Sequence, residues 1–301
     1  MSAPSAPSRA MTPCFYGSVN RWECDENDHL NVRFFAHKSN QAVQAHLAAL
    51  GFVDAVQSGP FASRVASQHI RFLREARLAV PLRIDCGTAA LAAGHVDVLS
   101  LTRNNLTDEL LCAFVTRVDV RGWPHPRVAP ALCDLPGQAQ PRGIDPADAY
   151  PTPPGIEAAA ARGFQTMGRG VIGHDECAPD GTLLPHVYIG RVSDGMPNLW
   201  AFVSSPEHSA ARDSGELGGA ALEYRLTVHA PLHANHVYRH MSGIRALGNK
   251  TQHMVHQVYD ETTGVCAASA EAVGVAMDLT TRRAVPISAE RRRMMERLLL
   301  S

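Results

Sequence analysis

The sequence lacks three features, and each lack excludes a class of protein. No apolar run reaches the roughly eighteen residues that a membrane-spanning helix needs, so no membrane association is expected. The formal net charge of the 301 residues is only −1, which gives no basic surface for nucleic acid. The seven cysteines are scattered, odd in number and never spaced Cys-x-x-Cys, so neither a disulfide framework nor a zinc knuckle is expected.

Targeting signals and several catalytic motifs are missing as well. Residues 1–13 are rich in Ser, Ala and Pro without an apolar stretch, which predicts a disordered segment and no secretory signal. With reduced thiols, this predicts a cytoplasmic protein. Ser193 is not in a Gly-x-Ser-x-Gly motif, and Gly248–Thr251 lacks the upstream glycine of a phosphate loop. The histidines of the second half show strand spacing but no convergence, so no metal and no cofactor is predicted.

What the chain does contain is a half-copy of itself. Glu-Cys at 23–24 recurs at 176–177, which is 153 residues later. Two further matches occur at a spacing of 154, namely 71–73 with 225–227 and 111–113 with 265–267. With a length that suits about two domains, this predicts two units of one fold. They are unequal, because Asp25 of the first copy corresponds to Ala178 of the second.

The order of elements is the same in both halves. Patterning predicts a strand at 15–22, a helix at 31–50 capped by Asp28 and closed by Gly51, and strands near 62–77, 79–92, 95–106 and 109–121. The second half repeats this as a strand near 167–175, a helix at 186–203, strands near 219–231, 234–247, 251–260 and 264–278, and a terminal helix at 288–300 with exposed Glu290, Arg291 and Arg292. We therefore expect an α+β fold with domains at 14–122 and 164–301, joined by a Pro- and Gly-rich linker at 123–163.

The turn before the first helix carries the most informative motif. Asp25, Asn27, His29 and Asn31 form the pattern Asp-x-Asn-x-His-x-Asn. This turn and the element order resemble the hotdog fold of acyl-CoA thioesterases of the 4-hydroxybenzoyl-CoA thioesterase type. Two units in one chain resemble the fused double-hotdog enzymes, although Asp28 replaces the family's usual glycine. The resemblance implies two tandem hotdog domains, each a long central helix wrapped by a curved antiparallel sheet.

The resemblance also implies the chemistry of an acyl-CoA thioesterase. Asp25 would act as general base or as nucleophile, and His29 would orient it or meet the substrate. Backbone amides near His29–Val32, at the positive end of the helix, would hold the oxyanion. Asn27 and Asn31 would fix the turn or contact the substrate. The plainer interpretation is that these side chains only close the turn.

The resemblance further implies that the acid of one half works in a cleft that the other half completes. The strand at 234–247 is the predicted second wall of this cleft. His236, Tyr238 and His240 alternate onto one face and are assigned to substrate binding, while Arg239 and Arg245 lie on the other face. The expected partner is an acyl-CoA. The fused pair is either complete alone or pairs again as a homodimer.

Two other functions stay open. A hotdog enoyl-CoA hydratase or dehydratase uses an Asp-x-Asn-Pro-x-His motif, but here the proline is missing and His29 comes one residue early. A non-catalytic acyl-CoA-binding protein is the alternative outside enzymes, because Ala178 shows that one copy has lost its acid.

Overall fold

A computed structural model describes residues 11–57, 61–92, 94–123, 126, 130–203 and 206–301. The chain divides into two compact units, Met1–Gln140 and Pro141–Ser301, and each is described by itself. The disorder expected for the N-terminus falls mostly on residues 1–10, outside the described residues. Residues 12 and 13 already belong to the first strand, so the ordered part begins earlier than expected.

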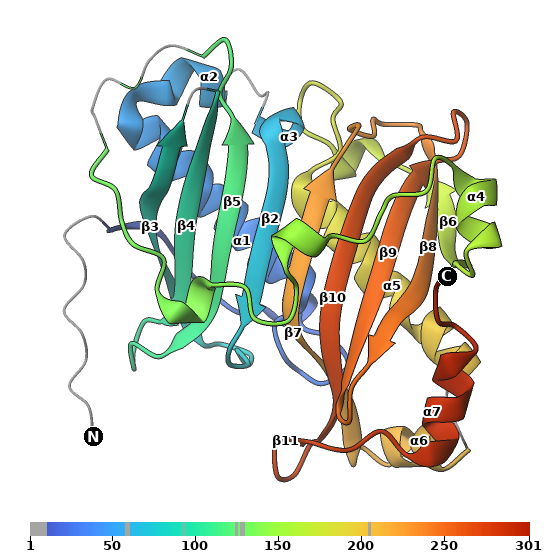
Figure 1. Ribbon diagram of the computed structural model, residues 1–301. Helices are drawn as coiled ribbons and strands as arrows, with labels where there is room; N and C mark the ends of the chain where they lie inside the picture. Colours follow the sequence, from blue (N-terminus) through green and yellow to red (C-terminus); the bar gives the residue numbers. More distant parts are fainter. Residues whose placement is uncertain (1–10, 58–60, 93, 124–125, 127–129, 204–205) are drawn as a thin grey trace. The chain divides into compact units, whose positions relative to one another are not determined.

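Unit 1 is a helix on an antiparallel sheet of order β1-β3-β4-β5-β2 (Figure 1). The long helix α1 lies against one face of this sheet. The elements are β1 (Thr12–Ser18), a 3-10 turn (Arg21–Glu23), α1 (Val32–Leu47), a π-helical segment (Ala48–Phe52), α2 (Val53–Gln57), α3 (Phe61–Arg64), β2 (Val65–Phe72), β3 (Pro81–Ala92), β4 (His95–Asn104), β5 (Leu110–Asp119) and a 3-10 turn (Gly137–Ala139).

Unit 2 repeats this plan with the sheet order β7-β10-β9-β8-β6 and a short β11 paired to β10. Its elements are a 3-10 turn (Pro146–Asp148), α4 (Ile156–Ala161), β6 (Gln165–Val171), a 3-10 turn (His174–Glu176), α5 (Pro185–Val203), α6 (Pro206–Asp213), β7 (Leu217–Val228), β8 (Val237–Leu247), β9 (Thr251–Asp260), β10 (Cys266–Asp278), β11 (Arg283–Ala284) and α7 (Ala289–Glu296). The predicted α+β class and the helix-on-sheet plan are confirmed in both units.

The core of unit 1 forms where α1 meets the sheet. Phe35, Val43 and Leu47 are buried, as the helical spacing predicts. Phe34, the residue before Phe35, is only half-buried. A period of 3.6 residues turns adjacent side chains about 100° apart, so Phe34 and Phe35 cannot share the core face.

Strand pairing corrects the spacing of the internal repeat. Phe72 pairs with Cys112 in unit 1, and Val228 pairs with Ala268 in unit 2, which places equivalent sheet positions 156 residues apart rather than 154. The Glu-Cys spacing of 153 holds at the turn. The connection between helix and sheet is therefore three residues longer in unit 2.

The described part of the predicted linker, 130–163, is packed and partly helical. Its first part belongs to unit 1, where the Cys133 amide donates to Thr88 O at 2.9 Å. Its second part belongs to unit 2, where the carboxylate of Glu223 accepts the amides of Arg142 and Gly143. The segment at 123–163 thus covers sheet surface as well as connecting the units.

Other helices depart from the expected pattern. The short helices α2, α3, α4 and α6 were not predicted. The terminal helix α7 begins at the predicted cap, Ser288, but ends at Glu296. Arg291 is buried rather than exposed, with its guanidinium carbon 5.3 Å from the centre of the Trp200 ring, and burial lowers its pKa to about 10.

Shortening a core side chain of α1 tests the packing. Leu47 is fully buried, so Leu47→Ala should lower the free energy of unfolding by about 2–5 kcal/mol through lost contacts and a cavity. Gln41→Ala, on the exposed face of the same helix, should change it by less than about 0.5 kcal/mol. Urea denaturation followed by circular dichroism measures both, and equal effects would contradict the packing.

Candidate active site

Asp25 lies in a tight turn that its own side chain closes. Its backbone amide donates to His29 O at 2.8 Å. Its Oδ1 accepts the amides of Asn27 at 2.9 Å and His29 at 3.1 Å. No residue that the structure describes bonds to Oδ2. The carboxylate is therefore fixed through one oxygen, and the other oxygen is available for chemistry.

The environment of Asp25 makes it a stronger base than an exposed aspartate. Burial raises the pKa of this carboxyl above its usual 3.8, while the amides of His29 and Asn27 act in the opposite direction. The direction suits a group that must accept a proton or attack a carbonyl near neutral pH.

The helix cap is Asn31 and not Asp28. The Asn31 side chain accepts the Arg33 amide at 2.9 Å, as an N-cap should. Asp28 has a positive φ of 58°, is exposed, and bonds to Arg21 at 2.5 Å. This left-handed conformation at the tip of the turn directs the Asp28 carboxylate away from the helix, so its predicted capping role is wrong.

Most amides expected to bind an oxyanion are already used. The His29 amide goes to Asp25, the Leu30 amide to Ala76 O at 2.7 Å, and the Asn31 amide to Glu23 O at 2.9 Å. The amide of Val32, the first residue of α1, has no acceptor among the described residues. Of the amides expected to bind an oxyanion, the Val32 amide at the positive end of the helix is therefore the candidate that is left.

The ring of His29 turns towards Glu75. His29 is buried, and its Nε2 lies 3.1 Å from Glu75 Oε2. The backbone amide of His29 contacts the Asp25 carboxylate. Glu75 follows β2 and was not identified from the sequence.

A buried ion pair ties the turn to the helix. Lys38 Nζ donates to Glu23 Oε1 at 2.8 Å, and each side chain is only 7% exposed. Glu23 also accepts the Asn20 amide at 2.9 Å. With the bond from the Asn31 amide, this fixes the turn relative to both β1 and α1.

Unit 2 keeps this framework without the acid. Glu176 pairs with Arg191, and both residues lie 153 positions after Glu23 and Lys38. The Ala178 amide donates to Thr182 O at 2.8 Å, just as Asp25 donates to His29. The backbone of the turn is conserved between the units, and its side-chain chemistry is not.

The side chains assigned to the second wall make their described contacts within unit 2. His236 Nδ1 lies 3.2 Å from Asp260 Oδ2, and the Tyr238 ring lies under the Arg191 guanidinium at 4.8 Å. His240 is fully buried, with its ring against Gly195 of α5 and its Nε2 2.9 Å from Ser242 Oγ. Substrate contacts by His236, Tyr238 and His240 remain predictions.

The two arginines on the other face of the 234–247 strand are neutralised by acids. Arg239 pairs with Glu261, and Arg245 pairs with Glu271 at 2.8 Å and Asp148 at 2.6 Å. These two guanidinium groups are therefore not free cations in the folded unit.

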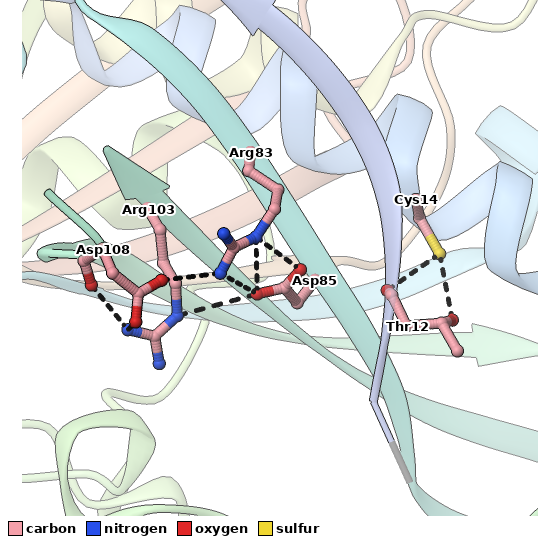
Figure 2. Close-up of polar contacts among 6 residues, drawn as sticks. All are labelled: Thr12, Cys14, Arg83, Asp85, Arg103 and Asp108. Carbon is pink, nitrogen blue, oxygen red and sulfur yellow. Dashed lines mark hydrogen bonds and ion pairs between the residues drawn. The ribbon is translucent and has the colours of Figure 1, made fainter. Parts of the chain in front are cut away.

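Arginines on the outer side of β3 and β4 are also paired with acids. Figure 2 shows Arg83 bonded to Asp85 at 2.9 Å and to Asp108 at 2.7 Å. Arg103 lies 3.6 Å from Asp85 and completes the network. The pKa of Arg83 is raised, chiefly by its bond to Asp85.

Comparison with known proteins gives structural matches only. No family model matches the chain, and no curated protein matches it. It is similar in structure to a putative oleoyl thioesterase from Lactobacillus plantarum, with a TM-score of 0.63, 11% identity, and coverage of 88% of this chain and 96% of the other. An acyl-ACP thioesterase from Bacteroides thetaiotaomicron matches with a TM-score of 0.60 and 8% identity, over 88% of this chain and 98% of the other. The 12:0-ACP thioesterase from Umbellularia californica matches with a TM-score of 0.58 and 11% identity, over 89% of this chain and 94% of the other.

Both units have the hotdog fold. The matches cover nearly the whole of each chain, and the helix-on-sheet plan is the one that the Asp-x-Asn-x-His-x-Asn turn implies. Within the described residues, no helix is long and apolar enough to cross a membrane.

The buried ion pair gives a test of how the turn is held. Lys38→Met leaves the Glu23 carboxylate buried without its cation, which should cost about 3–5 kcal/mol of unfolding free energy. Lys38→Arg should retain most of the stability, because Arg191 occupies the equivalent position in unit 2. Urea midpoints compare the two variants. Equal losses would show that charge at position 38 is not what matters.

Histidine burial in unit 2 predicts a loss of stability in acid. Burial lowers the pKa of His240 from 6.5 to about 3. The unfolded chain takes up this proton below about pH 6.5, whereas the folded unit does not until near pH 3. The contribution of neutral, buried His240 to the free energy of unfolding is therefore complete above pH 6.5 and is lost as the pH falls through this window.

His240→Ile should reduce that acid sensitivity. Ile84 occupies the equivalent position in unit 1, so the strand geometry accepts this side chain. Burial also lowers the pKa of His256, so part of the sensitivity remains. The measurement is the change in urea midpoint between about pH 7 and pH 5. The same change in wild type and variant would contradict the assignment.

Proposed function

We propose that the protein is an acyl-CoA thioesterase that hydrolyses an acyl-CoA to free acid and CoA at Asp25. The observation that carries this proposal is the Asp25 carboxylate itself, which is fixed through Oδ1 and has no described residue bonded to Oδ2. The Val32 amide at the start of α1 likewise has no acceptor among the described residues. The names of the three structural neighbours, all thioesterases, support the same reaction class.

Hydrolysis at this turn needs two groups. The Asp25 carboxylate removes a proton from water that attacks the thioester carbonyl, or attacks that carbonyl itself to give an anhydride that water then cleaves. The Val32 amide donates to the carbonyl oxygen as negative charge develops there. The CoA thiolate leaves and takes up a proton. Both routes consume one water and use the same carboxylate.

The remaining assigned residues take supporting roles in this proposal. Asn27 and His29 hold Asp25 through their amides, and Asn31 fixes the start of α1. His236, Tyr238 and His240 stay candidates for substrate contact. We place the reaction in the cytoplasm, and either one chain or a homodimer is the working form.

The buried ring of His29 argues against the hydratase alternative. Water addition across a double bond needs an imidazole that reaches the substrate, whereas His29 is buried and faces Glu75. Thioester hydrolysis with Asp25 needs no such reach.

Removing the acid tests the proposal. Asp25→Asn keeps the size of the side chain and an oxygen that can accept the two amides, but it provides neither base nor nucleophile. Release of free CoA from a panel of acyl-CoAs, followed with a thiol reagent, should fall by a factor of about 100 or more. Thermal unfolding should stay close to that of wild type.

A matched control lies in the other unit. Asp180 Oδ1 accepts the Thr182 amide at 3.0 Å in the turn of unit 2, so Asp180→Asn makes the same chemical change in the turn that lacks the proposed acid. This variant should keep wild-type turnover. Hydrolysis by Asp25→Asn within about threefold of wild type would make Asp25 structural. Loss of enoyl absorbance would indicate a hydratase, and binding without turnover would indicate a binding protein.

A further inference from the structure

A strip between α1 and β2 leads from the Asp25 turn into the interior of unit 1. It begins where the Leu30 amide donates to Ala76 O at 2.7 Å. The Phe35 and Phe72 rings then meet edge to face, with their centroids 5.9 Å apart. Deeper along the helix, Asn40 and Gln68 are joined by a hydrogen bond of 2.8 Å. The strip is apolar at its middle and polar at its inner end.

The polar end is a buried cluster of two amides and a hydroxyl. Gln68 and Thr116 are fully buried, and Asn40 is 4% exposed. Gln68 Nε2 donates to both Asn40 Oδ1 and Thr116 Oγ1, the second bond measuring 3.1 Å. Two primary amides in a helix–sheet interface are costly unless their polar atoms are bonded.

Two atoms of this cluster are left over. Asn40 Nδ2 and Gln68 Oε1 are buried and have no hydrogen-bond partner among the described residues. One is a donor and the other an acceptor. Reversing both amides exchanges these roles but still leaves one donor and one acceptor. The cluster is therefore complementary to a group that can both accept and donate.

Unit 2 has no such cluster at the equivalent positions. Tyr224 pairs with Ala272 in the β7–β10 register, where Gln68 pairs with Thr116 in unit 1. Tyr224 is buried, and Ser193 of α5 corresponds to Asn40. The Tyr224 hydroxyl is also buried without a hydrogen-bond partner among the described residues. Unit 2 therefore has one unbonded hydroxyl at this position, whereas the donor and acceptor of two paired amides accompany Asp25 in unit 1.

We propose that Asn40 and Gln68 form a subsite that binds a hydroxyl group on the acyl chain, so that the substrate is a hydroxyacyl thioester. This inference rests on the proposed function. A hydroxyl accepts from one amide and donates to the other, whereas a ketone satisfies only the donor and a methylene satisfies neither. Asn40 follows Asn31 by nine residues, about 13 Å along the helix, so the hydroxyl lies towards the far end of the chain.

The test compares ω-hydroxyacyl-CoAs with unsubstituted acyl-CoAs of matched chain length. The measured quantity is the ratio of kcat/KM for the hydroxyacyl-CoA to kcat/KM for the unsubstituted acyl-CoA. At one chain length this ratio should be about ten or more, because hydrogen bonds to buried amides discriminate strongly. In Asn40→Leu/Gln68→Met that ratio should fall to one or below. If the double variant fails to fold, Asn40→Ser takes its place in the test. It introduces the residue found at position 193 and should give a ratio between one and the wild-type value.

A control is available in the same interface. Ser39 and Ser100 bond to each other at 2.7 Å between α1 and the sheet. Ser39→Ala removes this buried bond without touching the paired amides, so the ratio should stay at its wild-type value. A merely structural role for the amides would lower turnover of both substrate series alike and would leave the ratio unmoved.

The outcomes separate this inference from the proposed function. Hydrolysis without a hydroxyl preference at any chain length, or a ratio unchanged in the amide variants, overturns the subsite and leaves thioesterase activity standing. No CoA release from either series overturns the proposed function. In that case the subsite is tested by the rise in unfolding temperature on adding ω-hydroxy or unsubstituted fatty acids. Equal rises with the two series overturn the subsite.

Discussion

The rest of the structure depends on a buried ion pair that fixes the active turn to the central helix. Glu23 and Lys38 are both 7% exposed, and each would be left as a buried charge if the other moved away. The pair therefore allows one arrangement of turn and helix. Its presence in unit 2 as Glu176 and Arg191 shows that the constraint belongs to the framework and not to the reaction.

On this common framework the two units have diverged in opposite directions. Unit 1 carries Asp25 at the turn and hydrogen-bonding amides in its interior. Unit 2 has Ala178 at the turn and a buried tyrosine, Tyr224, in place of the inner amide. At this position an aromatic ring contributes more apolar burial than an amide does.

The sequence predicted the elements and the position of the turn, because hydrophobic periodicity and the repeated Glu-Cys pair are local signals. It misjudged the helix cap, since whether Asp28 or Asn31 caps α1 depends on a positive φ at position 28. The repeat spacing was wrong by two residues in the sheet, because a shift of two preserves the alternation of faces. The Lys38 pair was missed, although a cation 153 residues later, at Arg191, was a readable signal.

Only unit 1 should hold a working thioester site, because unit 2 has Ala178 in place of the acid. Calorimetric titration of the wild-type protein with a non-hydrolysable thioether analogue of an acyl-CoA tests it most directly. We expect one analogue to bind per chain. Two equivalents per chain would show that unit 2 retains a site despite Ala178, and no binding would contradict an acyl-CoA site at Asp25.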